Sequence, residues 1–179
     1  MKRAVPIVAS FAVLLSATAA FAENPLTVAV MKSYSEMKTN FIDAASLMPE
    51  ESYGYRLTAG QQSFGEWMDH AGIANFYYCA RLGGTPPPDY EAIRTMRGKT
   101  AKADRRKFLE ESFKYCDAAL VGMDDSKAAA PLTFGKTTIY PATFLVGLLT
   151  GLNEHYGNVV GYLRTKGITP PSTAREAKK

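Results

Sequence analysis

The chain has 179 residues, with 21 Lys and Arg against 17 Asp and Glu, which gives a formal net charge of +4. This small positive surplus, without a basic stripe, argues against nucleic acid as a partner. The length corresponds to one domain that is able to bury a core of its own.

The first 22 residues have the pattern of a secretory signal peptide. Lys2 and Arg3 form a charged region, residues 6–15 are apolar, and Ala-Phe-Ala at 20–22 is a small-residue cleavage site. The apolar stretch is short for a bilayer of ~30 Å, so cleavage is favoured over its alternative, an uncleaved anchor. No cysteine follows the cleavage point, which excludes a lipoprotein signal. We expect an exported protein, periplasmic or secreted, whose net charge falls from +4 to +2 when Lys2 and Arg3 are lost.

Apolar residues at three- and four-residue steps predict long helices over about 26–47, 63–82, 101–121 and 141–166. Ser63 and Glu66 have the spacing of a capping box, which marks the start of the second helix. A Gly- and Pro-rich run ends that helix, and a short helical turn is expected further along the chain. The expected segments between the long helices are packed connectors at 49–62 and 122–138 and the turn at 90–97.

Together these elements predict an all-α four-helix bundle over residues 23–172, followed by a mobile polar tail at 173–179. In the second connector, Asp124 and Asp125 lack the spacing of a calcium loop and are expected to form a turn and a cap. After the signal peptide, no segment is apolar for ~20 residues, so no further membrane span is expected.

Two cysteines, Cys79 and Cys116, remain in a chain expected to enter an oxidising compartment. An even cysteine count in such a compartment favours a disulfide, and both residues follow aromatic runs that indicate burial. The alternative is two separate buried thiols.

The chain contains only two histidines, His70 and His155, and each has apolar neighbours at helical spacing. A buried imidazole nitrogen without a partner costs ~1–3 kcal/mol, so each ring needs a polar partner. The two rings either share a divalent metal in the bundle core or are separate histidines satisfied by other groups. Asp69 precedes His70 and is expected at the surface, because adjacent residues on a helix diverge.

Two runs resemble the DinB-like (damage-inducible) protein family: TAGQQSFGEWMDH at 58–70 and EHYGNVVGYLR at 154–164. The GITPP ending at 167–171 agrees, and SFKYC at 112–116 is similar to an exported branch of the family. The resemblance covers about residues 37–172. It implies a four-helix bundle that holds one divalent metal, namely nickel, zinc, iron or manganese, by three histidines.

In the family pattern, one histidine lies on helix two and two lie on helix four, four residues apart, so that both rings can reach one ion. His70 and His155 match two of these positions, but the third is Gly151, which cannot ligate a metal. Glu66 lies one turn before His70 and could replace the missing ligand, whereas Glu154 points ~100° away from His155 on the helix.

Three hypotheses for the function follow. The first in rank is a non-catalytic, exported binding or stress-associated protein with a degenerate metal pocket and an unknown small ligand. The alternative is a metal-dependent enzyme of the DinB-like S-transferase or hydrolase type that uses His70 and His155. A further alternative is a homodimer that assembles through the apolar side of the first helix. No Ser–His–acid set or Gly-rich phosphate loop is evident, so no catalytic or other cofactor-binding residue is assigned.

Overall fold

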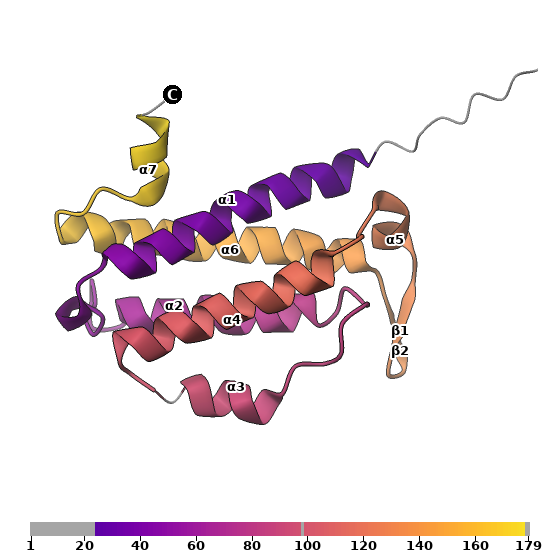
Figure 1. Cartoon of the computed structure of the whole chain (residues 1–179), viewed down its shortest axis with the longest axis horizontal. Helices are drawn as coiled ribbons and strands as arrows, with labels where there is room; N and C mark the ends of the chain where they lie inside the picture. Colours follow the sequence, from indigo (N-terminus) through magenta and orange to yellow (C-terminus); the bar gives the residue numbers. More distant parts are fainter. Residues whose placement is uncertain (1–23, 98, 178–179) are drawn as a thin grey trace, which may run out of the picture.

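The computed structural model of the protein describes residues 24–97 and 99–177 (Figure 1). The expected signal peptide at 1–22 lies outside these residues. Four long helices lie side by side as the predicted all-α bundle, each close to its expected bounds. They are α1 (Pro25–Leu47), α2 (Phe64–Cys79), α4 (Lys102–Leu120) and α6 (Pro141–Thr165). None of the helices in the described part of the chain combines the length and apolar character that a membrane crossing requires.

Shorter elements occupy the connections: η1 (Glu50–Ser52), α3 (Tyr90–Arg97), α5 (Asp125–Ala129), β1 (Leu132–Phe134), β2 (Thr137–Ile139) and α7 (Pro171–Glu176). The helical turn expected at 90–97 is α3, which lies outside the bundle beside α4 (Figure 1). The connector at 122–138 contains more structure than the sequence indicated, namely α5 and an antiparallel β1–β2 hairpin in which Leu132 pairs with Ile139.

Residues 173–176 of the segment expected to form a mobile tail belong to α7, which packs on α1. The guanidinium of Arg175 lies 2.9 Å from the carboxylate of Asp43 on α1, and the Tyr156 hydroxyl accepts a hydrogen bond from the backbone N–H of Ser172. Pro171 at the first position of α7 favours helix initiation. The polar composition of the segment does not reveal these partners, because they lie on distant helices.

Side-chain caps fix where the helices begin. The Ser63 side chain accepts from the backbone of Glu66, whose carboxylate accepts from the backbone of Ser63, so the predicted capping box is confirmed. Asp124 caps α5 through the backbone N–H of Lys127. The Asp125 carboxylate accepts from the first backbone N–H groups of α1, at 2.7 Å for the closer bond, and so caps a helix distant in sequence. The expected cap is confirmed, whereas Asp125 is the first residue of α5 and not part of a turn.

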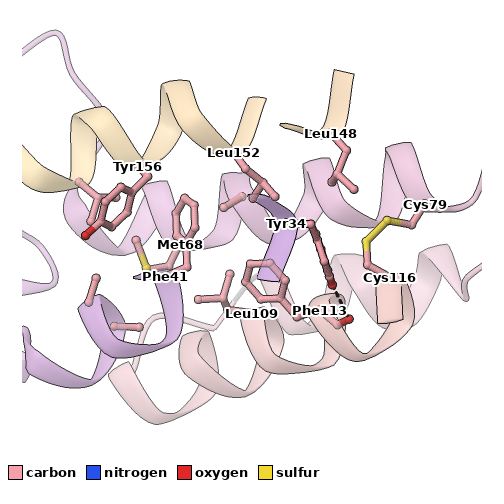
Figure 2. Close-up of a cluster of buried hydrophobic side chains, with 14 of the residues drawn as sticks. Tyr34, Phe41, Met68, Cys79, Leu109, Phe113, Cys116, Leu148, Leu152 and Tyr156 are labelled. Carbon is pink, nitrogen blue, oxygen red and sulfur yellow. Dashed lines mark hydrogen bonds between the residues drawn. A yellow bond between two sulfur atoms is a disulfide. The ribbon is translucent and has the colours of Figure 1, made fainter. Parts of the chain in front are cut away.

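Large apolar side chains from all four long helices meet in the centre of the bundle (Figure 2). The residues labelled there come from α1 (Tyr34 and Phe41), α2 (Met68 and Cys79), α4 (Leu109, Phe113 and Cys116) and α6 (Leu148, Leu152 and Tyr156). Their burial supplies the main driving force for packing the helices together.

The contact between α2 and α4 is close and covalently linked. Cys79 and Cys116 form the predicted disulfide, with their Cα atoms 5.2 Å apart (Figure 2). A Cβ at Gly72 would lie 2.7 Å from the Phe108 ring, so glycine is needed for α4 to approach this closely. The Asn75 amide also donates to the Ser112 hydroxyl across the same contact, at 3.0 Å.

Candidate functional site

His70 on α2 and His155 on α6 lie together, as the sequence predicted. Their ring centroids are 4.5 Å apart, with the rings in an edge-to-face arrangement. Trp67, one turn before His70 on α2, contacts both rings, with centroid distances of 5.8 Å to His70 and 5.6 Å to His155. The two helices therefore build a compact cluster of one indole and two imidazoles.

The prediction that His70 is buried and Asp69 exposed is wrong, because the structure shows the opposite. The His70 side chain is exposed, whereas Asp69, expected at the surface, is only 5% exposed. Asp69 faces α4, where the Arg105 guanidinium forms an ion pair with its Oδ2 at 3.3 Å. Arg105 lies against Gly65, where any side chain would overlap it. The partner of Asp69 comes from another helix, so spacing along α2 could not reveal it.

His155 is the buried member of the pair, at 8% exposure. Its Nδ1 atom finds no hydrogen-bond partner among the described residues. Burial lowers the pKa of His155 below its usual 6.5, the nearby His70 lowers it further, and Glu154 acts in the opposite direction. His155 is therefore held as the neutral imidazole, with a lone pair available to a donor or a metal.

Gly151, at the third family position, faces His155 but has no side chain that could ligate a metal. A Cβ built there would lie 3.7 Å from His155 Nε2 and 3.6 Å from the Tyr78 ring of α2. At Gly147, one turn earlier, a Cβ would lie 2.5 Å from the same ring, closer than any normal contact. The two glycines thus form a cradle on α6 in which the Tyr78 ring lies, beside the place where a third histidine would stand.

Glu66 does not supply the missing ligand. Its carboxylate accepts from the Ser63 backbone at 2.6 Å and from the Arg56 guanidinium at 2.8 Å. The Ser63 backbone hydrogen bond is the main cause of the lowered pKa of Glu66, opposed by burial and assisted by Arg56. The described residues contain no group of three or more His, Cys, Asp or Glu placed to hold a metal ion. The donor set therefore does not fit the three-histidine metal centre that the resemblance implies.

A polar cavity of about 300 Å³ opens beside His70. Its walls come from the connector before α2, from one face of α2 and from the end of α3. The lining residues are Arg56, Ala59, Gly60, Gln61, Gln62, Glu66, Asp69, His70 and Arg97. No sequence pattern predicts this cavity, because residues 58–62 lie in a connector whose conformation periodicity does not describe.

Comparison with known protein families decides the assignment. Residues 33–158 match the DinB superfamily. The chain belongs to the DinB superfamily. This match includes α2, α4 and most of α6, and therefore both histidines and Gly151. A comparison with curated proteins gives no match.

In this DinB protein, Gly151 stands where the family resemblance implies a third histidine. Tyr78 and the buried Asp69–Arg105 pair were not identified as site residues from the sequence. Gly147 and Gly151 are spaced one helical turn apart, and this spacing could have indicated that a large side chain approaches α6 closely.

Proposed function

We propose that this DinB protein is an exported, non-catalytic binding protein in which the metal pocket of the family has degenerated. The observation that carries the proposal is the Tyr78 ring lying in the Gly147–Gly151 cradle next to His155. An imidazole at position 151 would compete with that ring for space. Two imidazoles remain, which is one fewer protein ligand than a catalytic zinc site normally provides.

The contacts made by the cluster and by Glu66 support a binding role over metal chemistry. His70 and His155 contact each other and Trp67 through their ring faces and edges. The carboxylate one turn before His70, that of Glu66, accepts from the Ser63 backbone and from Arg56. What remains open beside His70 is the polar cavity, which is large enough for a small molecule.

Export rests on two independent features. The pattern at residues 1–22 is that of a secretory signal peptide. The Cys79–Cys116 disulfide supports an oxidising compartment, where such bonds persist.

The closeness of His70 and His155 favours one alternative, a metal-dependent enzyme of the S-transferase or hydrolase type. In this alternative the histidine pair, 4.5 Å apart between centroids, would bind a metal together with solvent or substrate atoms. The two proposals predict opposite results in a metal titration.

The test is calorimetric titration with nickel and with zinc, using the wild type and the variants Gly151→His, Tyr78→Ala and Gly151→His/Tyr78→Ala. We expect weak binding by the wild type and by Tyr78→Ala, and tight binding by the double variant, because only it has three imidazoles and free space. Gly151→His alone should bind less tightly than the double variant, since the Tyr78 ring obstructs the new side chain. Tight, stoichiometric binding by the wild type that is lost in His155→Ala would overturn the proposal and favour the enzyme.

A further inference from the structure

Two of the residues that line the polar cavity beside His70 carry a buried oxygen atom without a partner. Asp69 Oδ1 and Gln61 Oε1 are both buried and have no hydrogen-bond partner among the described residues. Both residues line the cavity, one from α2 and the other from the connector. Buried polar atoms are nearly always hydrogen-bonded, so two unpartnered oxygens on one cavity point to a ligand that donates hydrogen bonds.

Asp69 is the more specific of the two acceptors. Its side chain is only 8% exposed, and its Oδ2 is paired with the Arg105 guanidinium on α4. The Arg105 Nε also donates to the backbone oxygen of Lys99, so this guanidinium is held between two acceptors. The second carboxylate oxygen of Asp69 therefore remains for a ligand, and a carboxylate oxygen in a buried position favours a cationic donor over a neutral one.

Two arginines among the lining residues bring positive charge to the cavity. Arg97, at the end of α3, lines the cavity and is exposed, and its charge lies close enough to Asp69 to lower the pKa of that carboxyl. Arg56 also lines it, but its guanidinium already bonds to Glu66 and to the backbone oxygen of Gln61. Arg97 is thus the cation that remains for an anionic group, and planar guanidinium groups match carboxylates well.

We propose that this cavity binds a small zwitterion of the α-amino-acid class. The ammonium donates to Asp69 Oδ1 and Gln61 Oε1, and the carboxylate accepts from Arg97. The exposed His70 imidazole forms part of the wall. The inference rests on the proposed binding function and names the ligand class of that protein.

A volume of about 300 Å³ agrees with a ligand of this size. It stands at the lower end of the range found for small-molecule sites, and that end suits a molecule of amino-acid dimensions better than a larger ligand.

The first experiment screens the twenty standard L-amino acids against the full mature protein by thermal shift, followed by calorimetric titration of each one that raises the melting temperature. We expect at least one to bind. Its N-acetyl derivative, which lacks the ammonium, and its decarboxylated amine should each bind about tenfold more weakly or worse, because each loses a charge-assisted hydrogen bond. If no amino acid binds, or if the N-acetyl derivative binds as tightly, the inference is overturned.

Variants locate the site. Gln61→Ala and Arg97→Gln should each weaken binding of the identified amino acid about tenfold, and neither removes a partnered buried group, so both should fold. Arg94→Gln is the matched control, because Arg94 lies on the same short helix but pairs with Glu91 on the surface. It should bind like the wild type. Unchanged affinity in both Gln61→Ala and Arg97→Gln would contradict this assignment of the site.

The two proposals fail in distinguishable ways. If the wild type binds no amino acid and binds metal only weakly, the proposal of a zwitterion ligand is wrong. The proposed loss of the metal centre then still stands. Tight metal binding by the wild type overturns the proposed function, whatever the outcome of the screen.

Discussion

Helix α2 has two sides that are built on different principles. Its contact with α4 is cross-linked by the Cys79–Cys116 disulfide and by the buried Asp69–Arg105 ion pair. Its contact with α6 consists of ring-to-ring contacts around His155, whose Nδ1 atom is buried without a partner among the described residues. The α4 side therefore carries covalent and ionic links, whereas the α6 side carries the cluster of Trp67, His70 and His155. Substitutions in the α2–α4 contact should therefore lower the stability of the protein more than substitutions in the α2–α6 contact.

Removing the disulfide should have the largest effect. We expect Cys79→Ala/Cys116→Ala to lower the free energy of unfolding by about 4 kcal/mol, since the bond constrains the unfolded chain between residues 37 apart. Chemical denaturation of the variant and of the oxidised wild type measures the difference. Equal midpoints for the two proteins would show that the α2–α4 contact does not depend on the bond.

Removing one partner of the buried ion pair should come next. Arg105→Met should cost about 3 kcal/mol at pH 7.5, because it leaves the Asp69 carboxylate buried without its counterion. Burial already raises the pKa of Asp69 to about 6, against the opposing effects of Arg105 and Arg97 and with a smaller contribution from Glu66 in the same direction. At pH 5 the carboxyl group can take up a proton, so the cost should be smaller. Denaturation at both pH values checks this, and a cost that is independent of pH would contradict it.

On the α6 side, two glycine substitutions should have opposite signs. Gly147→Ala should destabilise the protein by about 1 kcal/mol, because the new methyl group collides with the Tyr78 ring and overpacking exceeds the gain in helix propensity. Gly151→Ala should stabilise it by up to about 1 kcal/mol, because its methyl group would make only ordinary contacts at 3.6 and 3.7 Å. Melting temperatures of both variants test the cradle, and equal shifts would show that Tyr78 does not occupy it.

The smallest effect concerns the protonation of His155. Its pKa is lowered in the folded protein, so the unfolded chain binds more protons once the pH falls below about 6.5. The contribution of neutral His155 to stability is therefore present at higher pH and is lost as the pH falls below its unfolded pKa. We expect His155→Gln to lose less stability than the wild type between pH 7.5 and pH 5.5. His70→Gln is the control, because it removes a neighbouring charge but leaves the buried ring. A steeper loss in His155→Gln would reverse the assignment.

The sequence predicted the parts of this molecule that depend on local patterns. Periodicity located the four long helices, and the spacing of Ser63 and Glu66 located a cap. The closeness of His70 and His155 followed from their helical positions and from the resemblance to the DinB family.

The features that the sequence did not predict, such as the burial of Asp69 and the position of Tyr78, depend on residues that lie far apart in the chain. Asp69 is buried because Arg105 meets it from α4, and that pairing leaves no signal around Asp69 itself. The position of Tyr78 over Gly151 depends on how α2 and α6 are rotated against each other. The absence of a third histidine is visible in the sequence, whereas the aromatic ring beside its place is not.

We propose that the DinB metal centre has been lost from this chain. Elemental analysis of the mature protein, exported by its own leader and purified without chelators or a histidine tag, tests it most directly. We expect nickel, zinc, iron and manganese each to be present at well below one ion per chain. One tightly held ion per chain, lost in His70→Ala and in His155→Ala, would contradict it.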